Sequence, residues 1–378
     1  MDETARGESA TARPLRVAIA CGGTGGHIFP GLATADVLGR RGHAVTLWLA
    51  GKDVEQSAVG NWPGEVITVP ARGLPHGFSP RALLSVWSLL YATRICRRRM
   101  RARTPDVLLA MGSYSSVGPV SAALRLGVPV ILHEANVLPG RAIRMFARRA
   151  RVVAASFEET RFHLRRNRIV VTGMPIRQDL EVASRDPRPA PPPVFTVLVF
   201  GGSRGAHRLN EIAVQAIRLL SARGVALKVL HIAGPADEAG VRTGYERAGV
   251  PREVFGFTSN MARLYAAADL AICRSGASTC AELLAFGVPA LLVPYPFAAA
   301  NHQQANARAL SKSGAADCIA EKDLTSDWLA DYLQACLGAP DRLARMNVAG
   351  RALRAHRGAE ELAALVERVG RGWDGKTA

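Results

Sequence analysis

The sequence contains no run of apolar residues close to the ~20 that a membrane-spanning helix requires. Its first fourteen residues also lack the apolar segment of a secretory signal, so we expect a loose tail on a cytoplasmic protein. The six cysteines include no C-x-x-C pair, and a chain of 378 residues does not need disulfides for its stability. We therefore expect reduced, mostly buried cysteines in a protein that can lie on a bilayer without crossing it.

Lysine is also scarce. Only five of the 48 basic residues are lysine, so arginine carries most of the positive charge, and the net charge is +17. A field of this sign concentrates phosphate-rich ligands and surfaces, which predicts an anionic partner without identifying it. A GC-rich genome would produce the same excess of arginine, so part of this charge is discounted as evidence for such a partner.

Short apolar runs alternate with longer helical patterns along the whole chain, which is typical of parallel sheets joined by crossover helices. We expect an α/β protein with two such units. The strands expected in the first half are Leu15–Ala20, Ala44–Leu49, Val107–Ala110, Val130–His133 and Val152–Ala155. The strands expected in the second half are Phe195–Phe200, Leu227–Ala233, Leu270–Cys273 and Ala290–Val293.

A proline-rich segment separates the two halves. Residues 185–193 read RDPRPAPPP, which fixes an extended connection and excludes a helix. We expect Gly173–Asp179 to be the last part of the first domain that faces the cleft. The predicted parts are a disordered tail at 1–14, a first domain at 15–184, a linker at 185–193, a second domain at 194–340, and a C-terminal segment at 341–378 with a helix that crosses back to the first domain.

A strand followed by a glycine-rich loop and a histidine occurs twice, at Val17–His27 and at Val197–His207. The loops read Gly22-Gly-Thr-Gly-Gly-His27 and Gly201-Gly-Ser-Arg-Gly-Ala-His207. The glycines let the backbone approach a ligand, and the following helix presents free amides and the positive end of its dipole. One copy alone is often only a packing turn. Two copies predict a ligand cleft between two facing nucleotide-binding domains, at the carboxyl ends of their strands.

Motifs of several other enzyme classes are absent. Neither loop is G-x-G-x-x-G, and the second expected strand ends without an acidic residue, which excludes a typical dinucleotide site. No Gly-Lys-(Ser/Thr) follows either loop, which excludes a P-loop. The chain has no Asp-x-Asp, and His133-Glu134 is not followed by a histidine at the zincin spacing. We therefore expect a reaction that needs neither a metal ion nor a cofactor.

Two further segments of the second half carry side chains suited to a sugar nucleotide. In Cys273–Glu282 a Ser-Gly-Ala turn begins a helix, and Glu282 near its start either reaches a diol or acts as a charge at the helix N-terminus. In Val293–Ala307 a proline-stiffened loop precedes a helix with Gln303 and Gln304. Their amides either bind sugar hydroxyls or lie on the surface of the helix.

Seven segments carry a more specific likeness. They are GGTGGHIFPGLA at Gly22–Ala33, MGSYSSVGP at Met111–Pro119, HEANVLPG at His133–Gly140, GMPIR at Gly173–Arg177, GGSRGA at Gly201–Ala206, CRSGASTCAE at Cys273–Glu282 and VPYPFAAANHQQANA at Val293–Ala307. They closely resemble, in the same order, the motifs of the MurG family of glycosyltransferases. The likeness covers nearly the whole chain from Leu15 onward.

This resemblance implies a GT-B fold, in which two Rossmann-like domains with parallel sheets face each other across a cleft. It implies an inverting, metal-independent transfer of N-acetylglucosamine from UDP-N-acetylglucosamine to the 4-hydroxyl of undecaprenyl-pyrophosphoryl-N-acetylmuramyl-pentapeptide in peptidoglycan synthesis. It also implies a peripheral protein at the cytoplasmic face of the cell membrane, with the anionic inner leaflet as a partner and with no cofactor or nucleic acid.

The resemblance also implies the residues of the site. The donor would be bound by Thr24, Gly25, Gly26, Asn136, Arg177, Ser203, Thr258, Ala277, Ser278, Thr279, Cys280, Ala281, Glu282 and Gln303, with Arg204 and Gln304 as additional candidates. Glu282 would bind the ribose hydroxyls, the Thr258 backbone would face uracil, and Ser203 would hold the pyrophosphate. His27 and the first glycine loop would lie on the acceptor side.

Four positions depart from the family pattern. Ala135 replaces the glutamine of HEQN, Met174 the asparagine of GNP, Arg204 the glutamine of GGSQGA and Ser278 the leucine of GALT. None of these changes removes an assigned donor ligand, but they alter the fine geometry of the site. Arg204 would add a positive charge beside the pyrophosphate.

The implied reaction needs a group that takes the acceptor's proton and groups that stabilise the leaving diphosphate. A neutral imidazole suits the first task, because its ordinary pKa of ~6.5 lies near the working pH, so His27 is the candidate general base. A hypothesis of nearly equal weight is that His27 only hydrogen-bonds the acceptor or orients the loop. The amides of Gly201–Ala206, the following helix dipole and Arg177 or Arg204 would stabilise the diphosphate.

Apolar residues precede a basic run between Phe78 and Arg103. The apolar residues are Phe78, Leu83, Leu84, Trp87, Leu90 and Tyr91, and the basic ones are Arg94, Arg97, Arg98, Arg99, Arg101 and Arg103. This arrangement is typical of a helix at the interface of an anionic membrane, although a helix packed on the protein's own core shows the same pattern. A second basic run, Arg141–Arg151 with Ile143, Met145 and Phe146, is a candidate to join this surface.

Two other functions compete with this interpretation. Another GT-B transferase would use a UDP-sugar but act on a different glycolipid or a small acceptor. A nucleic-acid-binding protein would explain the arginines and would bind with a steep salt dependence. The chain has no basic patch interleaved with aromatic residues and no nucleic-acid-binding module, so this second alternative ranks far below.

Overall fold

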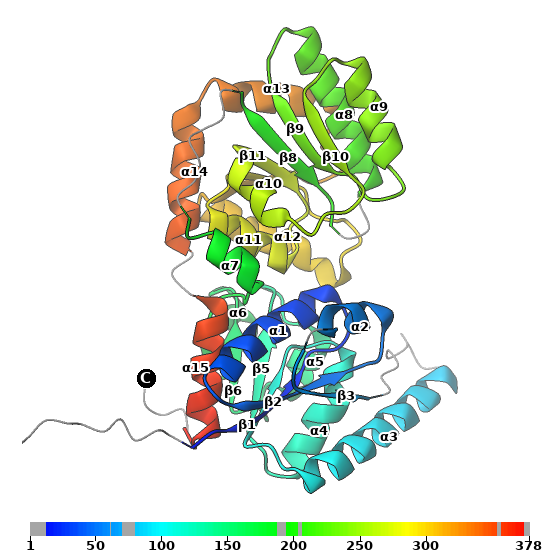
Figure 1. Ribbon diagram of the computed structural model, residues 1–378, viewed down its shortest axis with the longest axis vertical. Coiled ribbons are helices and arrows are strands. Elements are labelled where there is room, and N and C mark those ends of the chain that lie inside the picture. The colour runs from blue at the N-terminus through cyan, green and yellow to red at the C-terminus, as the bar shows by residue number, and fades with distance from the viewer. Residues whose placement is uncertain are drawn as a thin grey trace, which may run out of the picture.

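The computed structural model of the protein describes residues 13–60, 62–69, 80–186, 194–202, 206–353 and 357–373. Two α/β domains are stacked along the long axis of the molecule (Figure 1). Each domain contains a parallel sheet with a hydrophobic core on each of its faces. No helix in the described ranges is long and apolar enough to cross a membrane.

The first sheet has seven parallel strands in the order β3-β2-β1-β4-β5-β6-β7. The strands are β1 Arg16–Ala20, β2 Ala44–Leu49, β3 Glu65–Thr68, β4 Val107–Ala110, β5 Val130–Glu134, β6 Val152–Ala155 and β7 Ile169–Val171. The helices of this half are α1 Gly25–Arg40, α2 Asp53–Val59, α3 Pro80–Ala102, α4 Val117–Arg125, α5 Arg141–Phe146, α6 Thr160–His163 and α7 Gln178–Ala183.

The second sheet has six parallel strands in the order β10-β9-β8-β11-β12-β13. The strands are β8 Thr196–Phe200, β9 Lys228–Ile232, β10 Arg252–Phe255, β11 Leu270–Cys273, β12 Ala290–Leu292 and β13 Ala316–Cys318. The helices are α8 His207–Ala222, α9 Glu238–Arg247, α10 Met261–Ala267, α11 Ala277–Phe286, α12 His302–Lys312, α13 Ser326–Leu337, α14 Pro340–Leu353 and α15 Gly358–Gly370.

The nine strands expected from the sequence are all present, with ends that differ by no more than one residue. The predicted fold of two Rossmann-like domains is thereby confirmed. Four strands were not predicted, namely β3, β7, β10 and β13, and these are the edge strands of the two sheets.

The register of each sheet brings its functional loops together. In the first sheet Ala20, at the end of β1, pairs with Ala110, at the end of β4. In the second sheet Cys273, at the end of β11, pairs with Phe200 of β8 and with Leu292 of β12. The glycine-rich loops therefore leave their sheets beside the loops that carry the other motifs, as the carboxyl ends of parallel strands require.

The chain passes between the domains twice. Ile176, just before α7, and Leu180, within it, pack in the core of the second domain, so the segment assigned to the end of the first domain lies against the second. At the C-terminal end, α14 contacts α11 of the second domain, whereas α15 packs on the first sheet beside α1. Arg41 and His43 each contact Glu367 of α15 at 2.9 Å. The linker residues 187–193 and the tail residues 1–12 lie outside the described ranges, so those boundaries stay predictions.

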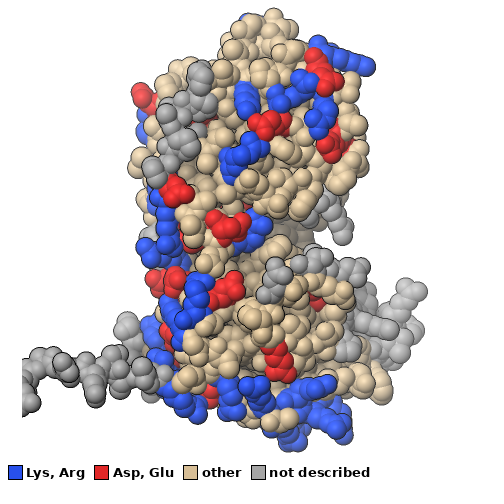
Figure 2. All heavy atoms as spheres, in the orientation of Figure 1, with Lys and Arg blue, Asp and Glu red and all other residues tan. Residues whose placement is uncertain are grey.

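The predicted membrane segment forms α3, which packs against α4. Trp87, Leu90 and Tyr91 are exposed by 71, 56 and 52%, and the rings of Trp87 and Tyr91 stack at 6.2 Å. Figure 2 shows basic side chains gathered at the lower end of the first domain, with few acidic ones among them. Phe78 and the side chains of Leu83 and Leu84 lie outside the described part of the structure.

The second basic run differs from its prediction. Ile143 and Phe146 of α5 are buried in the core of the first domain, because their short helix packs directly on the sheet. Met145 alone among the three apolar residues is exposed. This run therefore adds arginines to the surface but no apolar face.

Candidate active site

The first glycine-rich loop is held in place by a buried carboxylate. Gly23 has a φ of +131°, and a Cβ at this position would lie 2.5 Å from Ser113 Oγ, so only glycine fits. Glu55 of α2 accepts hydrogen bonds from the amide of Gly23 at 2.6 Å and from the amides of Ala50 and Gly51 at 2.8 and 2.6 Å. This side chain thereby joins the loop after β1 to the loop after β2.

His27 lies in the first turn of α1, directly behind that loop. Its Nδ1 is 3.0 Å from the Thr24 hydroxyl, and its ring lies against Gly112, whose missing Cβ would be 3.5 Å from Nε2. Burial, followed by the positive charge of Lys52, lowers the pKa of His27 to about 4. The ring is therefore neutral near pH 7, and when Nδ1 donates to Thr24, Nε2 is left as a proton acceptor.

The loop after β5 in the first domain is hydrogen-bonded to α12 of the second domain. Glu134 accepts hydrogen bonds from the amides of Asn136 and Gly140 at 2.9 and 2.8 Å, which gives the loop its shape. The side chain of Asn306 in α12 donates to Asn136 Oδ1 at 3.0 Å and accepts from the amide of Val137 at 3.0 Å. The predicted donor residue Asn136 thus contacts the second domain directly.

The start of α11 presents backbone donors. Its N-cap is Gly276, no side chain caps the helix, and its first turn has no acidic residue, so the first amides are free to bind an anion. The Cys280 side chain is fully buried in the core and offers no side-chain contact to a ligand. Ala277 and Ala281 line a cavity on another face of the helix. Of residues 277–282, Glu282 is the one with an ionisable side chain outside the core.

Glu282 lies in a cluster built from three separate segments. The hydroxyl of Tyr265 in α10 donates to Glu282 Oε2 at 2.8 Å. Burial raises the pKa of Glu282, while the hydrogen bond from Tyr265 and the charge of Arg177 oppose this shift. Arg177 precedes α7, and its Nη2 donates to the carbonyl oxygen of Ser259 at 3.3 Å. The Thr258 hydroxyl accepts from the amide of Asn260 within its own turn at 3.1 Å, which fixes the shape of this turn.

Gln303 and Gln304 point to different places. Gln303 Oε1 accepts from the amide of Tyr295 at 2.9 Å, which leaves its Nε2 as a donor. Gln304 Nε2 instead lies 3.8 Å from the sulfur of Cys318, and the residue lines a surface groove with Phe162. Gln304 is therefore not placed beside Gln303 for donor binding.

The loop before α12 has an unusual backbone. Ala300 and Asn301 have φ angles of +51° and +59°, which non-glycine residues rarely adopt and which cost free energy. Arg274 stabilises the preceding segment, since its guanidinium donates to the carbonyl oxygens of Val293 and Pro294 at 3.2 and 3.3 Å and pairs with Glu321. This loop thus holds Gln303 at the carboxyl end of β12.

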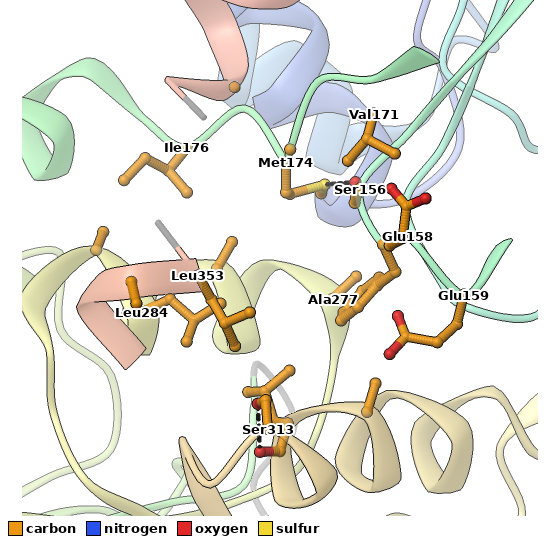
Figure 3. A pocket seen from close by; sticks show the side chains of 18 of the residues that line it. Ser156, Glu158, Glu159, Val171, Met174, Ile176, Ala277, Leu284, Ser313 and Leu353 are labelled. Carbon is orange, nitrogen blue, oxygen red and sulfur yellow. Dashed lines mark hydrogen bonds between the residues drawn. The ribbon is translucent and has the colours of Figure 1, made fainter. Parts of the chain in front are cut away.

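A cavity of about 320 Å³ lies between the domains and is lined by Ala277, Ala281 and Leu284 of α11 (Figure 3). Ser156 and Met174 form its wall in the first domain, and the Ser156 hydroxyl donates to the Met174 sulfur at 3.5 Å. Ala277 and Leu284 belong to the wall in the second domain, and Leu353 comes from the end of α14. Of the predicted donor residues within the described ranges, only Ala277 and Ala281 line this mainly apolar space, so it is not the donor site itself.

Several residues of the site were not predicted from the sequence. They are Glu55, Tyr265, Arg274 and Asn306. Arg274 and Asn306 lie inside motifs that the sequence singled out, and Asn306 follows Gln303 at the helical i, i+3 spacing. Glu55 and Tyr265 are distant in sequence from their partners, and no local pattern marks them. Ser203 and Arg204 lie outside the described residues. Among the described residues, no three His, Cys, Asp or Glu side chains gather in a way that would hold a metal ion.

Two family models of glycosyltransferases match the chain. Residues 17–155 match the family model described as Glycosyltransferase family 28 N-terminal domain, and residues 196–362 match that of the Glycosyltransferase family 28 C-terminal domain. The two matches fall on the two sheets. Together with the contacts of Asn306 across the two domains, they define a two-domain glycosyltransferase.

Relatives that match almost the whole chain narrow the class. The enzyme of Sinorhizobium fredii named UDP-N-acetylglucosamine--N-acetylmuramyl-(pentapeptide) pyrophosphoryl-undecaprenol N-acetylglucosamine transferase is 39% identical over 357 residues, which are 94% of this chain and 95% of the relative. A protein of the same name from Desulforudis audaxviator is 37% identical, over 94% of this chain and 98% of the relative. The crystal structure of Acinetobacter baumannii MurG superposes with a TM-score of 0.79 at 28% identity and covers 94% of this chain and 100% of its own. The chain belongs to the MurG family.

Proposed function

We propose that the protein transfers N-acetylglucosamine from UDP-N-acetylglucosamine to the 4-hydroxyl of undecaprenyl-pyrophosphoryl-N-acetylmuramyl-pentapeptide, with inversion and without a metal ion. The observation that carries the proposal is the cluster of Arg177, the Thr258 turn and Glu282 beside the free amides at the start of α11. This cluster offers a carboxylate, backbone groups and positive charge, which suit the ribose, base and diphosphate of a nucleotide. The names of the relatives supply the identity of the sugar and the acceptor.

In this proposal the donor lies mainly on the second domain. Glu282 accepts hydrogen bonds from the ribose hydroxyls, and the Thr258 backbone binds uracil. Gln303 donates from Nε2 to the sugar, since its Oε1 is already engaged. Ser203 and Arg204, with the amides of their loop, hold the pyrophosphate at the start of α8.

On the acceptor side, His27 is the general base. The acceptor oxygen forms a bond to the anomeric carbon while the bond from that carbon to the β-phosphate oxygen of UDP breaks. The proton of the hydroxyl passes to the neutral ring of His27. A single displacement of this kind inverts the anomeric centre, and the free amides and Arg177 stabilise the charge that develops on the diphosphate.

We extend the proposal to the membrane. Trp87, Leu90 and Tyr91 form an exposed apolar face on α3, and the C-terminal half of this helix is rich in arginine. Apolar insertion beside arginines that meet anionic headgroups would hold the protein on the inner leaflet, where a lipid-linked acceptor is found. The proposed role of this exposed face therefore depends on the acceptor being linked to a lipid.

The test uses the purified protein, labelled UDP-N-acetylglucosamine and a short-chain muramyl-pentapeptide lipid acceptor. We expect a β-linked disaccharide product, identified by mass spectrometry and NMR, with undiminished turnover in EDTA. A control reaction replaces the acceptor with a glycolipid that lacks the muramyl sugar, and we expect no transfer to it.

Other outcomes would select the competing functions. Transfer to the control glycolipid alone would identify a GT-B enzyme with another acceptor. Absence of turnover together with salt-sensitive binding of nucleic acid would overturn the proposal altogether. The membrane role is tested separately, since Trp87→Ser with Tyr91→Ser should weaken binding to vesicles containing anionic lipid without lowering turnover of a water-soluble acceptor.

A further inference from the structure

We infer that Tyr265 is a positioning residue for the carboxylate of Glu282 and that it determines the preference of the donor site for ribose over 2′-deoxyribose. The inference rests on the proposed function, because it takes Glu282 as the group that binds the ribose hydroxyls. Tyr265 does not reach the donor itself. Its role is to act on the side chain that does.

Tyr265 forms a hydrogen bond with one carboxylate oxygen of Glu282 and none with the other. Tyr265 is 1% exposed, and its hydroxyl donates to Glu282 Oε2 at 2.8 Å. The terminal torsion of a glutamate is broad, so an unbound carboxylate rotates freely about it. A hydrogen bond to Oε2 restricts that rotation and leaves Oε1 in a defined direction, which a pair of vicinal hydroxyls requires.

The tyrosine ring is itself immobile. It packs edge to face against Phe200 at 6.0 Å and tilted against Phe286 at 5.2 Å. Phe200 is the last residue of β8 and directly precedes the second glycine-rich loop. The hydroxyl is thus fixed by the core of the second domain at the base of the predicted phosphate loop.

The charge balance of the site supports the same role. Burial disfavours the ionised form of Glu282, and Asp179 adds to this effect, while Tyr265 and Arg177 favour the ionised form. Burial also raises the pKa of Tyr265 well above its ordinary value, so its hydroxyl keeps its proton and remains a donor. Tyr265 therefore keeps the carboxylate both oriented and ready to accept from ribose.

The experiment compares Tyr265→Phe with a matched control. Phenylalanine fills the same space and removes only the hydroxyl. Tyr245→Phe removes an equally buried hydroxyl from the same domain, where its partner is His231 at 2.9 Å and not a residue of the donor cluster. Binding of UDP and of 2′-deoxy-UDP to each variant is measured by calorimetry, together with kcat and KM for the donor.

We expect Tyr265→Phe to weaken UDP binding about tenfold, as for loss of a hydrogen bond to a charged group, and to leave 2′-deoxy-UDP binding within about twofold. The preference for ribose should then largely disappear, with a raised donor KM and a nearly unchanged kcat. Tyr245→Phe should keep the preference of the wild type. Should Tyr265→Phe not fold, Tyr265→Met removes the same hydroxyl with a more adaptable side chain.

Glu282→Gln separates this inference from the proposed function. If Glu282→Gln loses the preference for ribose but Tyr265→Phe keeps it, the inference is wrong and the ribose role of Glu282 stands. If Glu282→Gln also keeps the preference for ribose, Glu282 does not bind the ribose hydroxyls, and that part of the proposed function is wrong. An equal weakening of both nucleotides by Tyr265→Phe would show a purely structural effect and would overturn the inference.

Discussion

The two glycine-rich loops end in histidines with opposite surroundings. His27 packs against Gly112 beside Lys52, and burial lowers its pKa to about 4. His207, in the matching position of the second loop, is 72% exposed and contacts Asp237 and Glu211 at 2.9 and 3.3 Å. These carboxylates raise its pKa.

The contrast between His27 and His207 separates what a repeated motif determines from what its surroundings determine. The repeat produces a strand that ends at the matching residue in both domains, Ala20 in β1 and Phe200 in β8, followed by a helix that contains the histidine. The pKa of each histidine is decided by its surroundings, namely burial followed by the charge of Lys52 for His27, and the carboxylate of Asp237 for His207. One histidine is thus suited to accept a proton, and the other to carry positive charge at the edge of the predicted phosphate loop.

The largest effect is expected for His27→Ala. Loss of the general base should lower kcat by about 100-fold, the lower range for such groups, while the affinity for UDP stays nearly intact. The matched variant His207→Ala should lower kcat far less, because His207 takes no proton in the reaction. Single-turnover rates at saturating substrates measure both. Equal losses in the two variants would show that the histidines do not differ in role, and an unchanged kcat in His27→Ala would exclude the base role.

A smaller effect is expected for Glu55→Gln. The amide replaces an oxygen that accepts from backbone amides of two loops, so one donor would face another donor and the first loop would shift. We expect kcat/KM for the acceptor to fall about tenfold with little change in the affinity for UDP. Circular dichroism should show a folded protein. A change confined to UDP affinity would contradict the assignment of this loop to the acceptor.

Much of the fold could be predicted from the sequence, and the exceptions share a cause. Inner strands such as Val107–Ala110 are buried on both faces and read as continuous apolar runs. The edge strands do not. Glu65–Thr68 is mostly exposed, and the apolar run of Ile169–Val171 is only three residues long and half-buried, so neither is marked as clearly as an inner strand.

The site divides in a similar way. Residues inside a motif, such as Gly23 and Glu282, follow from local chemistry and from the resemblance to the family. Their supporting side chains do not, since Glu55 lies 32 residues from Gly23 and Tyr265 lies 17 residues from Glu282. These contacts arise from the parallel register of the strands and from helix packing, so they cannot be predicted from the spacing of residues along the chain.

Lys52→Met tests the electrostatic contribution to the low pKa of His27. The positive charge of Lys52 lowers the pKa of His27, so its removal should raise that pKa toward its ordinary value. His27 would then be protonated at a higher pH, and the acidic limb of the kcat/KM profile should move upward by up to about one pH unit. The profile of the free enzyme measures this shift. A limb that stays in place would show that His27 is not the titrating base.

The smallest effect concerns His207 and the pH dependence of stability. Its pKa is raised in the folded protein, so the folded state binds the proton more tightly than the unfolded chain does. The resulting stabilisation is present below the ordinary pKa of about 6.5 and is lost as the pH rises through the raised value. Wild type should therefore melt slightly above His207→Ala at pH 6, and the difference should vanish by about pH 9. His27 has a lowered pKa, so its protonation does not stabilise the folded state at low pH. A Tm difference between wild type and His207→Ala that does not change with pH would contradict the electrostatic contrast between the two histidines.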